Sequence, residues 1–219
     1  LVEGESVAAL VPEGDLPKGV ERVVIGGLLA PGFIDLHVHY PQADIIGSPA
    51  EGLLPWLERY TFPAEARFAD AAHARSVAEF FLDELLRNGV TTALTFATSH
   101  PASVEALFQA AHARGLRLIT GKGLQDRNGP DGVRDQAERS LLESEALIKA
   151  WHGVGRLGYA LTPRFAPTSS EAQLRGAGEL AARHPKRRMR LLHGLGQHVA
   201  QRHLVPFGVE FDALILEHR

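Results

Sequence analysis

Two histidines separated by one residue, His37 and His39, are the first candidates for chemistry in this sequence. They end the apolar run 33–39, which predicts a β-strand. Because residues two apart in a strand point to the same face, about 7 Å apart along the backbone, both imidazoles can reach one metal ion. Nitrogen ligands of this kind suit zinc. Taken alone, however, a His-x-His pair is more often a satisfied or surface pair than a metal site.

Strands and helices that alternate along the chain must position this pair. Strands are predicted over 33–39, 90–96, 116–120, 157–161 and 189–193, and helices within 65–87, from 101, near 134–151 and over 169–183. This alternation predicts a parallel sheet with helical crossovers. Four strand–helix units of about 38 residues fill residues 33–185, whereas a closed eightfold barrel needs on the order of 300 residues. The chain therefore holds about half of such a barrel.

The first thirty residues favour strands and turns over helices. Residues 7–11 are a short apolar run that Pro12 ends, and residues 22–29 are a second run rich in β-branched residues. Such runs predict strands. A piece of this size is too small for a core of its own, so we expect it to pack on something else.

Composition excludes several classes of protein. Apolar residues make up 45% of the 219 residues and charged residues 22%, which is typical of a folded globule and not of a disordered tail. The absence of cysteine excludes disulfides, thiolate zinc sites and cysteine nucleophiles. A formal charge of −3 gives no electrostatic basis for a nucleic-acid partner. The apolar runs are too short for a membrane span and no leader opens the chain, which is compatible with a cytoplasmic protein.

The stretch Pro31-Gly32-Phe33-Ile34-Asp35-Leu36-His37-Val38-His39 resembles the opening of the amidohydrolase superfamily. In that superfamily two such histidines end the first barrel strand and bind a catalytic metal. The resemblance implies an α/β fold, a partial (β/α)8 TIM-like barrel over residues 31–203. Residues 1–30 would belong to a small β-sandwich, and residues 204–219 to its return strand. It also implies one Zn²⁺ per subunit, with His37 and His39 among the ligands.

Further segments, in order along the chain, narrow the resemblance. These are Tyr40-Pro41-Gln42 and the stretches 52–63, 80–93 and 162–168. Together they resemble the guanine deaminases of this superfamily, zinc aminohydrolases that convert guanine to xanthine and ammonia. The match covers about residues 28–185.

The same resemblance implies that Gln42, Arg164 and Phe165 bind the substrate. The amide of Gln42 offers a donor and an acceptor to a purine edge, and the guanidinium of Arg164 has donors for its acceptor atoms. Phe165 could cover an aromatic face. The alternatives are backbone hydrogen bonds for Gln42, a salt bridge for Arg164 and core packing for Phe165.

Three other features have weaker support. Trp56 is expected to pack in a lid over the pocket and not to take part in the chemistry. His100 follows a strand and precedes Pro101, and it is not expected to line the site. Gly121-Lys122-Gly123 lacks the spacing of a phosphate-binding loop, so it receives no functional assignment.

The C-terminal part departs from the guanine deaminase pattern. The resemblance places a third metal histidine where His193 stands and a proton-shuttling glutamate where the sequence has Gly196. Glycine cannot transfer a proton, so the catalytic residue stays unassigned. His198 and His203 are further ligand candidates without a motif. No segment matches the later metal ligands, and residues 206–217 resemble the late return strand. A deletion, a frame error or a sequence assembled from ordered segments would each produce this pattern.

Three functions remain open from the sequence. The first is hydrolytic deamination of guanine, a step of purine catabolism and salvage, by a homodimer as is usual in the family. The second is deamination of another purine, a pterin or a triazine by a different amidohydrolase. The third is an inactive fragment that at most binds a metal or a partner chain.

Overall fold

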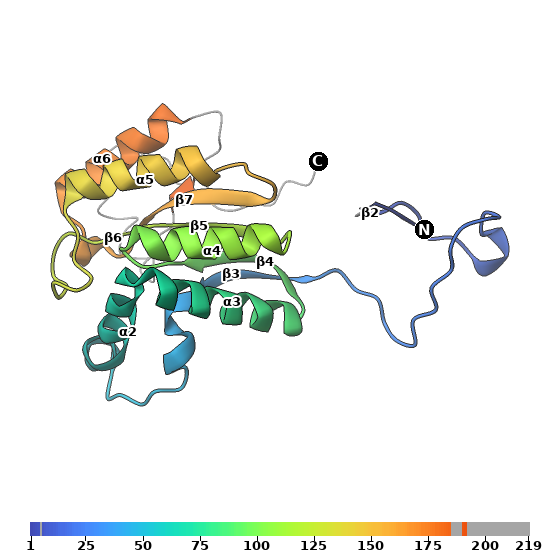
Figure 1. Cartoon of the computed structure of the whole chain (residues 1–219), viewed down its shortest axis with the longest axis horizontal. Coiled ribbons are helices and arrows are strands. Elements are labelled where there is room, and N and C mark those ends of the chain that lie inside the picture. The colour runs from blue at the N-terminus through green and yellow to red at the C-terminus, as the bar shows by residue number, and fades with distance from the viewer. Residues whose placement is uncertain (5, 185–189, 192–219) are drawn as a thin grey trace. The chain divides into compact units, whose positions relative to one another are not determined.

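The computed structural model (Figure 1) describes residues 1–4, 6–184 and 190–191 and contains one parallel sheet within residues 33–191. Its strands are β3 (Phe33–His39), β4 (Val90–Phe96), β5 (Arg117–Gly121), β6 (Gly123–Leu124), β7 (Leu157–Pro163) and β8 (Arg190–Leu191). Their order is β3-β4-β5-β7-β6, and β8 also pairs with β7. Because β5 and β6 both pair with β7 and only Lys122 separates them, they form one interrupted course of chain. Five parallel courses therefore follow one another in chain order, as in a partial barrel.

A helix follows each of the first four courses. These helices are α3 (Ala71–Arg87), α4 (Pro101–Ala113), α5 (Ala137–Trp151) and α6 (Glu171–Arg183). Consecutive helices contact each other, so they form a layer in chain order against the sheet (Figure 1). The predicted α/β class, with parallel strands and helical crossovers, is confirmed. Among the described residues, no helix combines the length and the apolar composition that crossing a bilayer requires.

Side chains at the helix ends explain several of the boundaries. Asp70 caps the start of α3, because its carboxylate accepts a hydrogen bond from the backbone N–H of Ala72. Ser170 caps α6 in the same way through the N–H of Gln173. Pro101 is the first residue of α4, where its missing N–H costs nothing. The helix that was predicted from about residue 134 begins later, at Ala137.

The hydrophobic core lies between the sheet and the helix layer. Leu82 of α3, Phe108 of α4, Leu118 of β5 and Ile148 of α5 are all fully buried. Every residue of β7 is buried, as expected for a central parallel strand that is covered on both faces. The core thus fixes the carboxyl ends of neighbouring strands against one another.

Short elements fill the long connection between β3 and α3. They are η2 (Tyr40–Ile45), α1 (Leu53–Trp56), η3 (Leu57–Thr61), α2 (Phe62–Ala66) and η4 (Arg67–Ala69). A further short turn, η5 (Ala166–Thr168), follows β7. The η3 segment has π-helical geometry, which is uncommon and is frequently found at functional sites.

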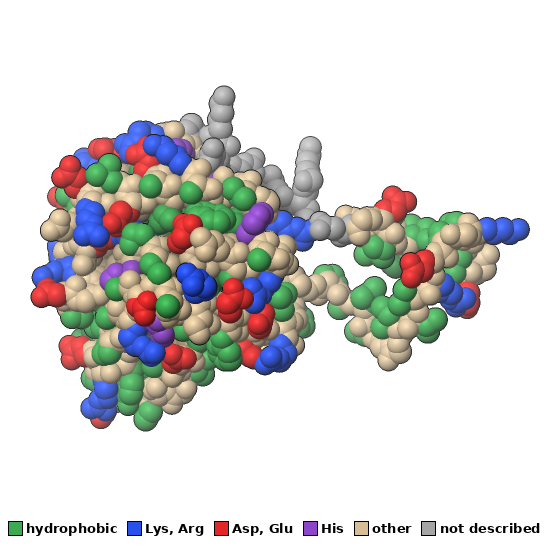
Figure 2. Space-filling view, viewed as in Figure 1, with side chains coloured by type: hydrophobic (Ala, Val, Ile, Leu, Met, Phe, Trp, Pro, Cys, Tyr) green, Lys and Arg blue, Asp and Glu red, His purple; other side chains and the backbone are tan. Residues whose placement is uncertain are grey.

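Ion pairs join the helices at the surface. Figure 2 shows charged side chains of both signs interspersed over one face of the part of the chain that contains the sheet. Arg114, at the end of α4, pairs with Glu79 and Asp83 of α3 at 2.5 and 2.8 Å. Both carboxylates are about half exposed, and ion pairs at the surface contribute little to stability, typically about 0.2–1 kcal/mol each.

Gly121 allows β5 to approach β7 closely. A Cβ atom at this position would overlap the carbonyl oxygen of Ala160. We therefore expect Gly121→Ala to lower the free energy of unfolding by about 1–3 kcal/mol through overpacking. Urea unfolding followed by circular dichroism measures this change. Gly178→Ala on α6 is the control, because a Cβ there meets nothing within 4 Å. Equal stability of the two variants would contradict the prediction.

The chain divides into two compact units, Leu1–Pro31 and Gly32–Arg219. The first contains an antiparallel pair, β1 (Val2–Glu3) with β2 (Ser6–Val7), and the turn η1 (Glu13–Asp15). Of the run 7–11, only Val7 lies in a strand. The strand predicted over 22–29 is wrong, because these residues are described and form none. Val24 and Leu28 are 80% and 94% exposed. Their β propensity favours an extended chain, but a strand also needs a neighbour for its backbone groups.

The assignment of residues 1–30 and 204–219 to a sandwich, and of 31–203 to a barrel, remains a prediction. The strand predicted over 189–193 is described only at β8. The candidate ligands His193, His198 and His203, together with Gly196, lie outside the described residues.

Candidate functional site

A hollow of about 850 Å³ opens beside β3 and reaches its carboxyl end. All five residues predicted for the site line it: His37, His39, Gln42, Arg164 and Phe165. They come from two strand ends that are far apart in the sequence. The volume lies within the range of about 300–1,000 Å³ that is usual for small-molecule sites. Carboxyl ends of parallel barrel strands are also where such sites are found.

The two imidazoles at the end of β3 lie next to each other. Their ring centroids are 5.2 Å apart, with the ring planes tilted by 55°. His39 stacks on Phe96 of β4 at 4.7 Å, and His37 contacts the same ring at 5.3 Å. In addition, the backbone N–H of His37 donates to a carboxylate oxygen of Asp35 at 3.0 Å. Packing against the neighbouring strand therefore orients both rings.

The electrostatic surroundings keep His39 neutral. Burial, followed by the positive charge of Arg164 and the nearby His37, lowers the pKa of His39 to about 3. A neutral imidazole is the form that binds a metal. Two nitrogen donors fit zinc chemically and would supply two of the three protein ligands that a catalytic zinc usually has. Among the described residues, no group of three or more His, Cys, Asp or Glu side chains could hold a metal ion.

Gln42 is placed by the turn that follows β3. It belongs to η2, whose first residue, Tyr40, is fully buried. The hydroxyl of Tyr40 donates to the backbone oxygen of Ser103 at 2.7 Å. This anchor fixes the turn against α4 and leaves the Gln42 side chain at the wall of the hollow.

Arg164 follows directly after β7. Its backbone N–H donates to the carbonyl of Leu124 at 3.0 Å. Its guanidinium forms an ion pair with the carboxylate of Glu65 and lies 5.7 Å from the centre of the Phe62 ring. The alternative of a salt bridge is therefore realised, and the same side chain still lines the hollow.

Glu65 is the residue of this neighbourhood that the sequence analysis missed. Its side chain is 1% exposed, and burial raises its pKa while the charge of Arg164 opposes that shift. The one signal in the sequence is spacing, because Thr61, Glu65 and Phe68 fall on one helical face. All three are buried in the structure. A carboxylate on a buried face implies a partner, but the sequence does not say which one.

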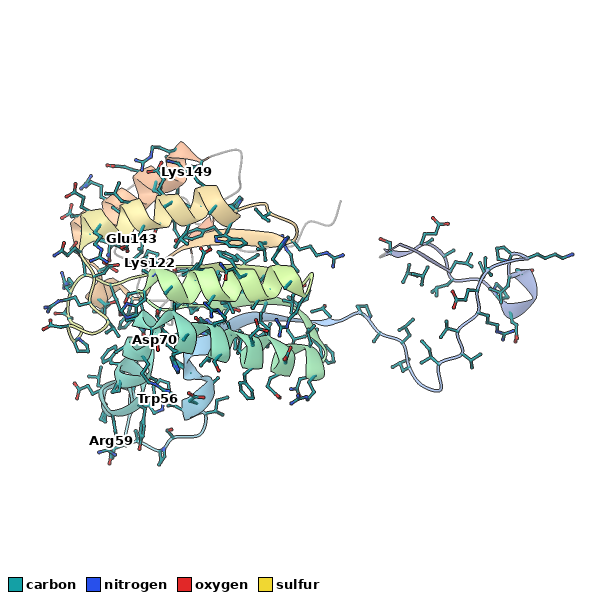
Figure 3. The ribbon with its side chains drawn as sticks, in the orientation of Figure 1. Trp56, Arg59, Asp70, Lys122, Glu143 and Lys149 are labelled. Carbon is teal, nitrogen blue, oxygen red and sulfur yellow. The ribbon has the colours of Figure 1, made fainter. Side chains whose placement is uncertain are left out.

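Of the other residues considered from the sequence, some line the hollow and others do not. Trp56, at the end of α1 and labelled in Figure 3, lines the hollow; its packing in a lid stays a prediction. Phe165 also lines it. His100 does not: its Nε2 lies 3.0 Å from the carbonyl oxygen of Gly132. Lys122 points away from the hollow, toward α5.

Known proteins resemble this chain over most of its length. The family model described as "Amidohydrolase family" matches residues 28–197. The guanine deaminase of Escherichia coli (strain K12) is 52% identical over 160 residues, which are 73% of this chain and 36% of that protein. A probable guanine deaminase of Deinococcus radiodurans is 46% identical over 160 residues, again 73% of this chain and 36% of that protein. The chain spans about a third of the length of these curated relatives.

Solved structures give the same result. A structure of the E. coli guanine deaminase superposes with a TM-score of 0.71 at 47% identity, covering 78% of this chain and 38% of that one. A guanine deaminase from C. acetobutylicum, with guanine bound in its active site, superposes with a TM-score of 0.72 at 32% identity. That match covers 78% of this chain and 41% of the other. With a half-barrel of parallel strands, a histidine pair at the end of the first one and a family match over residues 28–197, the chain belongs to the amidohydrolase family.

Proposed function

We propose that the protein hydrolyses guanine to xanthine and ammonia, using a metal ion, zinc, to activate the water. The observation that carries this proposal is that His37, His39, Gln42, Arg164 and Phe165 all line one hollow. Relatives named guanine deaminase support it, as does the relative whose active site holds guanine. A small purine is therefore the proposed substrate.

The chemistry divides between the metal and the side chains. His37 and His39 would hold a zinc ion, which when bound would supply an activated water at neutral pH. The side-chain amide of Gln42 and the guanidinium of Arg164 bind the polar edges of the purine, and Phe165 packs against its ring. Together they hold the ring so that its amine-bearing carbon faces the water. In the net reaction a C–O bond would form and the C–N bond would break; one proton of the water would leave with the amine as ammonia, and the other would end on the ring nitrogen beside the new carbonyl.

Metal removal and a substrate panel test this function. We expect the protein to release ammonia from guanine, to lose this activity after dialysis against a chelator and to regain it with Zn²⁺. The panel contains adenine, a pterin and an aminated triazine, which the alternative amidohydrolase functions would favour. A protein that binds zinc but leaves guanine untouched would refute the proposal. Turnover by the 219-residue chain alone would exclude the inactive-fragment alternative.

Gln42→Ala tests substrate binding apart from the metal. We expect KM for guanine to rise by about tenfold, because one amide that pairs with the purine edge is lost. Bound zinc should stay at the wild-type level, since the side chain of Gln42 is not a proposed ligand. Steady-state kinetics and metal analysis measure the two quantities. A fall in bound zinc with an unchanged KM would contradict the assignment.

A homodimer in the cytoplasm is the proposed setting of this reaction. Its support is the resemblance to the guanine deaminases, which are usually cytosolic homodimers. Light scattering after gel filtration would measure the mass of the assembly, and fractionation of cells would locate it. A monomer at micromolar concentration would contradict the proposed dimer.

A further inference from the structure

Two side chains of α2 hold the guanidinium of Arg164 at the wall of the hollow. Glu65 accepts a hydrogen bond from Nη1 of Arg164, and the ring of Phe62 lies 5.7 Å from the guanidinium carbon. Glu65 and Phe62 are three residues apart, so they lie on neighbouring positions of one helical turn. Arg164 follows β7 and is 99 residues from Glu65 along the chain.

Burial makes this ion pair different from the surface pairs of the molecule. The side chains of Arg164 and Glu65 are 14% and 1% exposed, whereas the pair Arg175–Glu171 on α6 is 57% and 70% exposed. Taking both charges out of water has a large desolvation cost, so a buried pair is weak evidence for a role in stability. A fixed arginine at the wall of a ligand site is a better explanation of this arrangement.

Among the described residues, the polar contact given for the Glu65 side chain is the one with Arg164. Oε1 of Glu65 is buried and has no hydrogen-bond partner among the described residues, and the same holds for Oγ1 of Thr61, one turn earlier. Glu65 itself does not line the hollow, so Arg164 is the group through which we expect it to affect a ligand.

We propose that Glu65 is a positioning residue for substrate recognition. Its carboxylate and the Phe62 ring fix the guanidinium of Arg164 so that the remaining N–H donors face the acceptor atoms of the purine. This inference rests on the proposed function, because it assigns Arg164 to guanine. It adds that the selectivity of the site depends on a carboxylate outside the hollow.

A double-mutant cycle tests the inference in the zinc-loaded protein. Glu65→Gln should raise KM for guanine by about 10- to 100-fold with kcat changed little, because a misplaced arginine loses binding in the ground state and transition state alike. In an Arg164→Gln background the same substitution should add less than about twofold, since its target is gone. Glu65→Asp keeps the charge and should recover part of the loss. Glu171→Gln, which breaks the exposed pair with Arg175, is the matched control and should leave KM unchanged.

A labelling experiment tests the positioning without relying on turnover. Phenylglyoxal modifies accessible arginines, and mass spectrometry of peptides reports the rate at Arg164. We expect Glu65→Gln to accelerate this rate by about tenfold, because a charge-assisted hydrogen bond no longer protects the guanidinium. If Glu65→Gln does not fold cooperatively, Glu65→Asp and Phe62→Leu supply the readout, and each should give a smaller acceleration.

The outcomes separate the two proposals. A wild-type protein that releases no ammonia from guanine overturns the proposed function, and the labelling rates still decide on Glu65. Normal turnover with equal KM and equal labelling in wild type and Glu65→Gln overturns the inference alone. A KM effect of Glu65→Gln that persists in full without Arg164 also overturns it, because Glu65 would then act by another route.

Discussion

Replacing His39 by alanine is expected to lower kcat/KM for guanine by at least about 10³-fold and to reduce the bound zinc. The reason is that zinc is proposed to supply the activated water, a contribution of several kcal/mol to the barrier. His39 lies 5.2 Å from His37, ring to ring, and stacks on Phe96, so its removal leaves one oriented nitrogen where two stood. Metal analysis and ammonia release measure the two effects on the same samples.

The matched control is His112→Ala. His112 is an exposed histidine near the end of α4 and does not line the hollow. Its loss should leave zinc content and kcat/KM at wild-type values. If His39→Ala retained the full metal content and activity, the metal assignment would fail, and with it the proposed mechanism.

Much of the fold could be predicted because its signals are local. The apolar runs 33–39 and 90–96 coincide with β3 and β4, and Pro101 begins α4. In parallel strands the carboxyl ends meet at one edge, so His39 and Arg164 could be expected near each other once both strands were recognised. Their ligand and substrate roles remain predictions that the experiments above decide.

The failures arise where the decisive contact is distant in sequence. The run 22–29 has the residue types of a strand, but pairing depends on a neighbour and not on propensity. Glu65 looks like an ordinary helix residue until Arg164, 99 residues later, is placed beside it. Pair interactions of this kind leave no periodic trace in a single sequence.

Lys122 is the clearest example of a residue whose surroundings could not be predicted from the sequence. Between two glycines it has the appearance of a loop residue, yet its side chain is 0% exposed. Its ammonium forms ion pairs with Asp135 and, at 3.4 Å, with Glu143, and it donates to the Ser140 hydroxyl at 3.2 Å. Figure 3 shows Lys122 beside Glu143 of α5. The break between β5 and β6 therefore directs the charged side chain of Lys122 into the space between the sheet and the helices.

Lys122→Ala is accordingly expected to lower the free energy of unfolding by about 3–5 kcal/mol, because it leaves the buried carboxylate of Asp135 without its ion-pair partner. Glu143 loses one of two cations and keeps its pair with Arg139 at 2.8 Å. Urea unfolding of the two proteins at pH 7 measures the difference. Lys149→Ala is the control, because the side chain of Lys149, also labelled in Figure 3, is 67% exposed in its pair with Glu145. An exposed pair should change stability by less than about 1 kcal/mol. Similar effects of the two substitutions would contradict the role of burial.

The pKa of Lys122 also predicts how the stability difference between wild type and Lys122→Ala changes with pH. Burial lowers the pKa of Lys122 from 10.5 to about 8, so between these two values the unfolded chain binds a proton that the folded chain does not. Stability therefore rises with pH in that window, by at most about 1.4 kcal/mol per pH unit for one group. Lys122→Ala lacks this contribution, so the stability difference from wild type should widen between pH 8 and pH 10. If the stability difference narrows over the same range, the carboxylates raise the pKa of Lys122 by more than burial lowers it.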